Sequence, residues 1–184
     1  MVNTYSDYLS FRKIEAKKMS TMKSLFFSEP TDTFLKQLRR VELCYNSNKL
    51  IFKLLLPFFY YLYRRISIRT GISIPKNVCD KGLSIPHFGS IVVNANCKIG
   101  ANCRIQNNVN IGATGGSSKA PIIGNNVYIG PGAVIYGDIL IADNCYIGAN
   151  AVVNKSFEEP FSVIVGVPAK IVRIESCAWF QKLD

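Results

Sequence analysis

Aliphatic residues recur at every sixth position through much of this chain, and this period constrains the fold more than any other feature. One segment rich in Gly and Ser interrupts the register. Neither the period of 2 of an exposed strand nor the period of 3.6 of an amphipathic helix reproduces it. Counted from the first position, the register comprises Val93, Ile99, Ile105, Ile111, Ile123, Ile129, Ile135, Ile141, Ile147 and Val153.

Small residues accompany this register. Glycine follows the aliphatic residue at five of the ten positions, and a small or branched residue lies four places after most of them. An aliphatic residue beside a turn-forming Gly or Asn suits a chain that makes a short strand, turns a corner and repeats. Three sides make one coil, and coils stacked about 4.8 Å apart bury the aliphatic residues in a continuous core. The sequence therefore predicts a β-helix, with Cys97, Cys103 and Cys145 as core fillers.

Composition limits what else the chain contains. Of 184 residues, 48% are hydrophobic and 18% are charged, which suits one globular fold with a modest appendage. The net charge of +10 is concentrated in residues 1–70. Six cysteines without a C-x-x-C pair, together with a single histidine, do not assemble a Cys/His zinc site, so we expect no metal. We expect no nucleic acid partner either, because the basic residues accompany aliphatic rather than base-stacking motifs.

We expect a cytoplasmic protein, because no secretory signal is evident. The longest apolar stretch, residues 50–63, contains a lysine and a proline and is shorter than the roughly 20 residues of a membrane span. This stretch has two interpretations. It covers the end of the β-helix or a neighbouring subunit, or it lies with Arg64, Arg65 and Arg69 on an anionic membrane, at the inner face.

Residues 1–70 are predicted to be helical. A first helix is expected from Tyr5 to Met19, opened by Ser6 or Asp7, and a second begins at Pro30. A third helix is expected over about residues 47–69, kinked or broken near Pro57 and ended by the following glycine.

The Ile-Gly repeats, the segment NIGATGG at 110–116 and the segment VGVPAK at 165–170 resemble those of the hexapeptide-repeat acyltransferases. GLSIPHFGSIVVN at 82–94 is similar to the serine O-acetyltransferase branch, and closer to its relatives that modify capsular and surface polysaccharides. The resemblance implies an all-β left-handed parallel β-helix at 71–173. An α-helical region at 1–70 precedes it, and a tail at 174–184 follows.

His87 occupies a register position, six residues before Val93, where the other positions are aliphatic. An imidazole is tolerated there only if a partner satisfies it or the coil bulges to expose it, and the neighbouring Pro86 and Gly89 favour a bulge. The resemblance makes His87 the general base that takes the proton of an acceptor hydroxyl as it attacks acetyl-CoA, without an acyl-enzyme. Its orienting partner stays open between Asp80, Ser73 and a backbone carbonyl.

The interruption GATGGSSKAP at 112–121 lets the backbone approach a ligand closely. By resemblance, its residues Gly112, Ala113 and Thr114 contact the pantetheine arm of acetyl-CoA, the donor substrate.

The register also places two alanines on one column, beside Asn150 and a glycine, and these small residues predict a groove for the same arm. Three basic residues near the C-terminus are candidates for the CoA phosphates. The predicted groove and phosphate contacts are Gly132, Ala133, Ala151, Lys155, Lys170 and Arg173.

The resemblance implies a homotrimer in which His87 of one chain faces the CoA groove of the next, with higher-order assembly through the N-terminal helices left open. Three positions depart from the serine acetyltransferase pattern: Pro86 replaces an acidic residue, Ser73 an aspartate and Ala120 a histidine. These departures favour a saccharide hydroxyl, in a capsular or surface polysaccharide or its precursor, as the acceptor. The alternatives are a serine O-acetyltransferase of cysteine biosynthesis and a non-enzymatic β-helix scaffold.

Overall fold

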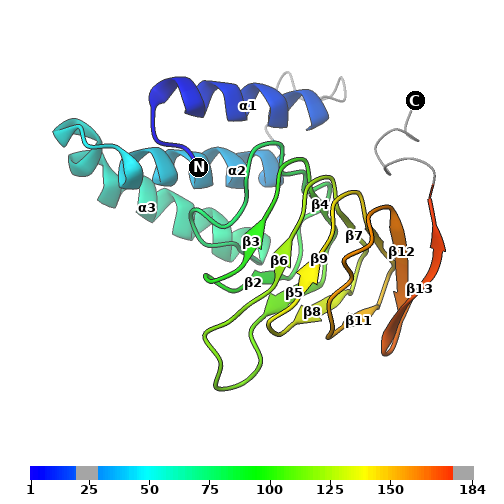
Figure 1. Cartoon of the computed structure of the whole chain (residues 1–184). Coiled ribbons are helices and arrows are strands. Elements are labelled where there is room, and N and C mark those ends of the chain that lie inside the picture. Colours follow the sequence, from blue (N-terminus) through cyan, green and yellow to red (C-terminus); the bar gives the residue numbers. More distant parts are fainter. Residues whose placement is uncertain (20–28, 176–184) are drawn as a thin grey trace.

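A computed structural model describes residues 1–19 and 29–175 of the chain. Three helices lie at one end of a prism of short strands (Figure 1). The helices are α1 (Tyr5–Met19), α2 (Pro30–Asn46) and α3 (Leu50–Thr70). None of the described helices combines the length and apolar character that crossing a membrane requires.

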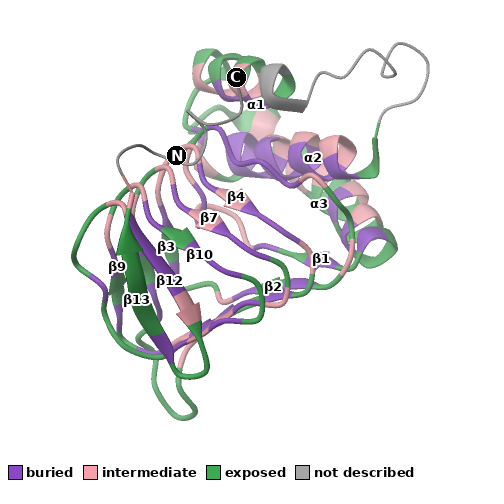
Figure 2. Cartoon of the chain, turned by 90° about the vertical axis from the view of Figure 1, so that its right-hand side faces the viewer, coloured by how far each residue is buried: buried purple, intermediate pink, exposed green. Residues whose placement is uncertain are grey.

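The strands form the three sides of the prism, which Figure 2 views end-on. The first sheet has the order β1 (Ile72–Ser73), β2 (Ile91–Val93), β5 (Val109–Gly112), β8 (Val134–Tyr136) and β11 (Val152–Val153). The second has the order β13 (Ala169–Ile174), β12 (Ser162–Gly166), β10 (Tyr146–Ile147), β7 (Tyr128–Ile129) and β4 (Arg104–Ile105). The third comprises β3 (Lys98–Ile99), β6 (Ile122–Ile123) and β9 (Leu140–Ile141).

Pairing between strands confirms the predicted β-helix. The neighbouring strands are parallel, except that β13 turns back antiparallel to β12 after the cis Val167–Pro168 bond. Ile91 pairs with Val109, three hexapeptides later in the sequence. Across the interruption, Ile99 pairs with Ile123, four hexapeptides later. The segment at 112–121 is therefore an extra hexapeptide added at a corner.

The predicted core is confirmed, because all ten aliphatic register residues are at most 3% exposed. Each such side chain stabilises the fold by about 1.5–3 kcal/mol on burial. Cys97, Cys103 and Cys145 are buried among them, as expected of core fillers.

The repeat glycines have a different role from the one we predicted. Of the five, none has a positive φ. At Gly100, an added Cβ would lie 2.6 Å from the carbonyl oxygen of Gly124, and at Gly130 it would lie 2.7 Å from the nitrogen of Ala149. These glycines thus let successive coils approach each other. The left-handed corner positions are taken by asparagines, with φ between 56° and 62°: Asn102, Asn108, Asn126, Asn144 and Asn150.

The helices close the N-terminal end of the prism. Helix α3 is continuous through Pro57, so the predicted break is absent, and Gly71 ends the helix in the left-handed conformation with φ 73°. Helix α1 begins with a reciprocal capping interaction between Thr4 and Asp7 rather than at Ser6. Helix α2 is buried between α1, α3 and the first coil (Figure 2).

A buried arginine joins these elements. Arg39 of α2 is 0% exposed and donates to the carboxylates of Glu15 and Glu42, at 2.8–2.9 Å. It also donates to the carbonyl oxygens of Cys79 and Asp80, at 2.8 and 2.7 Å. Arg39 therefore connects α1 and α2 to the first coil of the prism.

Candidate functional site

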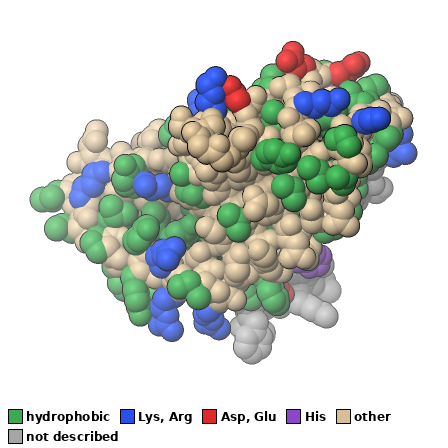
Figure 3. Space-filling view, turned by 90° about the horizontal axis from the view of Figure 1, so that it is seen from below, with side chains coloured by type: hydrophobic (Ala, Val, Ile, Leu, Met, Phe, Trp, Pro, Cys, Tyr) green, Lys and Arg blue, Asp and Glu red, His purple; other side chains and the backbone are tan. Residues whose placement is uncertain are grey.

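His87 lies on a bend between the bridge residue Ser84 and strand β2. Its side chain is exposed, and the histidine is drawn in purple at the surface in Figure 3. Ile85 and Ile91, on either side of the bend, are both 0% exposed. The chain therefore fills its core from these two positions and leaves the imidazole accessible to solvent.

The C-terminal end of α3 holds this bend in place. The N–H of Gly89 donates to the carbonyl oxygen of Thr70 at 2.9 Å, and the N–H of Ile91 donates to that of Gly71 at 3.1 Å. The two segments are so close that a Cβ on Gly71 would lie 3.2 Å from the carbonyl group of Gly89. The helix end and the His87 bend are thus one packed unit.

The side chains predicted to orient His87 do not contact it. Asp80 accepts a hydrogen bond from the N–H of Lys81 at 2.7 Å and lies 3.8 Å from the amino group of Met1. Ser73 lies in β1, where it pairs with Val92. Within residues 1–19 and 29–175, the imidazole has no hydrogen-bond partner, backbone carbonyls included.

The glycine-rich segment forms an exposed loop between β5 and β6 that projects from the prism (Figure 1). Gly112 and Ala113 are half-buried at its base, and Thr114 is exposed. Two contacts that the sequence did not predict hold the loop to the coil. Asn96 Nδ2 donates to the carbonyl oxygen of Ser118 at 2.7 Å, and Lys119 Nζ pairs with Asp138 Oδ2 at 2.6 Å. Single Asn and Asp residues among many corner residues give no sequence signal of such partners.

The predicted groove of small side chains is wrong in part. Ala133 and Ala151 are both 0% exposed, because the position four residues after each aliphatic residue points into the core. Their backbone groups are also used: the carbonyl oxygen of Ala133 accepts from Asn110, and that of Ala151 accepts from Val134. Gly132 is half-buried at the corner with φ 72°, and an added Cβ would meet the side-chain oxygen of Asn150.

The three basic residues predicted to bind CoA phosphates are exposed but differ in their contacts. Lys155 follows β11, and its Nζ lies 5.5 Å from the centre of the Phe157 ring. Lys170 and Arg173 lie in β13, and Arg173 Nε pairs with Glu175 Oε1 at 2.7 Å. Lys155 and Lys170 are therefore better placed than Arg173 to contact an added phosphate.

One chain places His87 and the glycine-rich loop at different corners. The strands of the first sheet are parallel, so the His87 bend precedes β2 whereas the loop follows β5. Ile91, which follows the bend, pairs with Val109, and Gly112 lies three residues beyond Val109. At about 3.3 Å per residue, Gly112 is therefore about 10 Å farther along the sheet than Ile91. The bend and the loop are thus separate parts of the surface of one chain.

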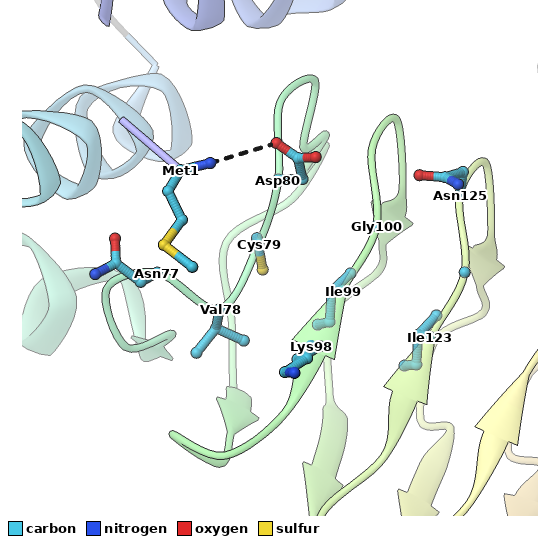
Figure 4. Close-up of a pocket in the computed structure, with 11 residues that line it drawn as sticks. Met1, Asn77, Val78, Cys79, Asp80, Lys98, Ile99, Gly100, Ile123 and Asn125 are labelled. Carbon is cyan, nitrogen blue, oxygen red and sulfur yellow. Dashed lines mark ion pairs between the residues drawn. The ribbon is translucent and has the colours of Figure 1, made fainter. Parts of the chain in front are cut away.

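Two pockets lie near the N-terminal end of the prism. A pocket of about 330 Å³ is lined by Pro30, Thr33, Ile66, Arg69, Thr70 and Phe88, and Phe88 adjoins His87 in the sequence. A second, of about 360 Å³, lies at another corner, between Met1 and the first coils, with Asp80, Lys98 and Asn125 at its edge (Figure 4). Of these two pockets, the first adjoins the His87 bend.

Within the described residues, no group of three His, Cys, Asp or Glu side chains is placed to hold a metal ion.

Comparison with known proteins identifies the repeat. The family described as bacterial transferase hexapeptide (six repeats) matches residues 120–155. Serine acetyltransferase of Buchnera aphidicola subsp. Schizaphis graminum is 37% identical over 117 residues, which is 61% of this chain and 44% of the relative. The chain spans about half the length of the curated relatives it matches.

Solved structures extend the likeness into the helical region. Soybean serine acetyltransferase complexed with serine is 25% identical, with a TM-score of 0.73 over 91% of this chain and 70% of that chain. A serine acetyltransferase in complex with CoA is 21% identical, with a TM-score of 0.72 over 91% of this chain and 71% of that chain, which shows the fold alone.

These comparisons confirm the resemblance to hexapeptide-repeat acyltransferases and correct its branch. The relatives and solved structures in these comparisons are serine acetyltransferases. The predicted saccharide acceptor, and with it a role in polysaccharide biosynthesis, is therefore contradicted.

Proposed function

We propose that this hexapeptide-repeat chain is an acetyl-CoA-dependent O-acetyltransferase whose acceptor is the hydroxyl of L-serine. One observation carries the proposal: the only histidine of the chain breaks an aliphatic register, and its side chain is exposed on a bend that helix α3 holds in place. The serine acetyltransferase relatives support the choice of acceptor. We include in the proposal the left-handed winding that the resemblance implies.

In the proposed reaction, His87 accepts the proton of the serine hydroxyl as its oxygen attacks the thioester carbonyl carbon of acetyl-CoA. The C–S bond then breaks, CoA leaves as a thiolate, and the imidazolium returns the proton to the sulfur. The products are O-acetyl-L-serine and CoA. Solvent exposure of the ring in the free chain leaves it accessible to both substrates.

We further propose that acetyl-CoA lies between copies of the chain in a homotrimer, against the glycine-rich loop of one copy and His87 of the next. The placement of these two elements at different corners supports this arrangement. The half-buried Gly112 and Ala113 at the base of the loop admit close approach by the pantetheine arm. Lys155 and Lys170 are the proposed phosphate contacts.

Release of CoA from acetyl-CoA tests the reaction, with L-alanine as the matched acceptor that lacks the hydroxyl. We expect release with L-serine only, and a loss of about 10²- to 10⁴-fold in kcat for His87→Ala. Equal release with both amino acids would contradict the serine acceptor. Full activity of His87→Ala would contradict the general base.

Mixing two inactive variants tests the shared site. Thr114→Trp is designed to block the loop and His87→Ala removes the base, so each variant alone is expected to be inactive. In randomly mixed trimers, about a quarter of the interfaces combine an intact loop with an intact His87. We therefore expect about a quarter of normal activity from co-expressed chains. No recovery in assembled mixed trimers would place the whole site within one chain.

A further inference from the structure

Helix α3 is apolar on two opposite faces, although a helix at a protein surface ordinarily has one apolar stripe. On one face, Leu56, Phe59, Tyr63 and Ile66 pack against α2 and the end of the prism. This face performs the covering role that the sequence predicted for the segment.

The opposite face consists of large apolar side chains that are exposed. From Ile51 onward they are spaced three, four or seven residues apart along the helix, and with Leu50 they form one stripe rather than scattered exposures. Figure 3 shows apolar and basic side chains intermixed at the α3 end of the molecule. The stripe, with the exposed fraction of each residue, is Leu50 (72%), Ile51 (57%), Leu54 (68%), Phe58 (56%), Tyr61 (58%) and Ile68 (73%).

The charges of α3 are all of one sign. Lys53, Arg64, Arg65 and Arg69 lie between Leu50 and Thr70, and this helix contains no Asp or Glu. All four are exposed, and in the described part of the chain none of them pairs with a carboxylate. The helical spacing places Arg65 and Arg69 within the apolar stripe and Arg64 beside it.

We propose that this face of α3 lies on an anionic lipid surface, parallel to the membrane plane. The apolar stripe enters the boundary between headgroups and acyl chains, and the basic residues contact the anionic headgroups. The aromatic rings of Phe58 and Tyr61 suit this boundary, where apolar and polar surroundings meet.

The charge pattern favours lipid over a second copy of the chain. A two-fold contact through α3 would bring the same four cations of both copies together, with no carboxylate on either helix to neutralise them. An anionic headgroup layer supplies the missing charge. Membrane contact of this kind is independent of the acetyl transfer proposed above.

Co-sedimentation of the full chain with lipid vesicles tests the proposal. We expect binding to phosphatidylcholine vesicles that contain about 30% phosphatidylglycerol, and loss of binding when the salt is raised from about 0.1 M to about 0.5 M. Binding to vesicles of phosphatidylcholine alone should be at least tenfold weaker, because each basic residue near an anionic surface raises the affinity about fivefold.

Two double variants separate the charge from the apolar contribution. Arg64→Gln with Arg65→Gln should weaken binding about 25-fold, and Leu54→Ser with Phe58→Ser should weaken it at least about tenfold. Tyr5→Ser with Leu9→Ser is the matched apolar control, because both residues are exposed on α1, on the far side of α2 from α3 (Figure 1). Lys13→Gln with Lys81→Gln is the matched charge control, and both control variants should bind as the unchanged chain does.

Three outcomes would overturn the proposal: no binding to anionic vesicles, equal binding to neutral vesicles, or equal weakening by the control variants. If the unchanged chain does not bind vesicles, and Leu54→Ser with Phe58→Ser has a lower sedimentation coefficient than the unchanged chain, the face contacts a second copy of the chain instead. Circular dichroism of each variant shows whether it is folded before binding is measured.

Discussion

Removal of Arg39 is expected to destabilise the chain more than the loss of any exposed charge. Its guanidinium has five N–H donors, and the structure pairs all five, with Glu15, Glu42 and the carbonyl oxygens of Cys79 and Asp80. Burial opposes the charge of Arg39, but Glu42 and Glu15 outweigh it, so the pKa of Arg39 is raised. The side chain is therefore a fully paired buried cation.

Arg39→Met keeps most of the side-chain volume and leaves two buried carboxylates facing each other without a counter-charge. Breaking a buried pair in this way costs about 3–5 kcal/mol, a large part of the about 5–15 kcal/mol that stabilises a typical domain. Arg40→Met is the matched control. Arg40 is half-buried and stacks on Phe59 at 5.3 Å, so its loss should cost about 1 kcal/mol or less.

The cost of Arg39→Met should also depend on pH. Burial raises the pKa of Glu15, while Arg39 acts in the opposite direction, so removal of Arg39 raises this pKa further. The folded variant then binds more protons than the unfolded chain between the unfolded pKa of Glu15 and the raised folded one. Its stability is consequently highest below the unfolded pKa and falls as the pH rises through this window.

Urea unfolding followed by circular dichroism, at about pH 5 and about pH 7.5, measures both effects. We expect a larger destabilisation at the higher pH for Arg39→Met and no such difference for Arg40→Met. A cost for Arg39→Met no larger than that of Arg40→Met, or one independent of pH, would refute the role of Arg39 as the counter-charge.

Three further predictions concern the coil. Gly124→Ala places a Cβ 2.8 Å from the nitrogen of Asp143 and should cost about 1–3 kcal/mol in urea unfolding, whereas Gly115→Ala meets no neighbour and should cost less. Asp138→Asn removes the partner of Lys119 in an exposed pair, so we expect little change in Tm but a raised KM for acetyl-CoA; an unchanged KM would separate the loop from the donor site. Thiol labelling at about pH 8 should be slow in the folded chain and fast in urea, because the thiols are buried and because burial raises the pKa of Cys44, Cys79, Cys97 and Cys145, to about 11 for Cys97. The buried thiols are Cys44, Cys79, Cys97, Cys103 and Cys145, and rapid labelling of all of them without urea would contradict the closed core.

The fold was predictable from the sequence wherever a residue had to fill the core. A position that recurs inside the prism must be aliphatic in every coil, so its period is visible without any structure. The contribution of Arg39 was not predictable in the same way. Its partners Glu15 and Cys79 are 24 and 40 residues away, and no local pattern connects residues so far apart. The repeat glycines were misinterpreted because a sequence does not distinguish a positive φ from a close approach of two coils.

The candidate site was predictable only in part, because catalytic and binding residues lie outside the periodic core. His87 is a proposed site residue because it breaks the register, and the loop is a proposed part of the site because it interrupts the register. Ala133 and Ala151 were placed in a groove because they are small, although their register position is the same as that of the buried Cys145. Register alone would have assigned both alanines to the core.

The same reasoning accounts for the wrong acceptor. Three departures from the serine acetyltransferase pattern were interpreted as lost acceptor contacts, but the structure places them in different surroundings. Ala120 is 7% exposed and belongs to the core, so its identity reports on packing at the end of the loop. Ser73 is exposed in β1, and Pro86 is half-buried beside His87. A substitution bears on the acceptor only where the side chain is accessible to it, and at Ala120 this condition fails. The number of departures from a family pattern is therefore weaker support for a new acceptor than the position of each one in the coil.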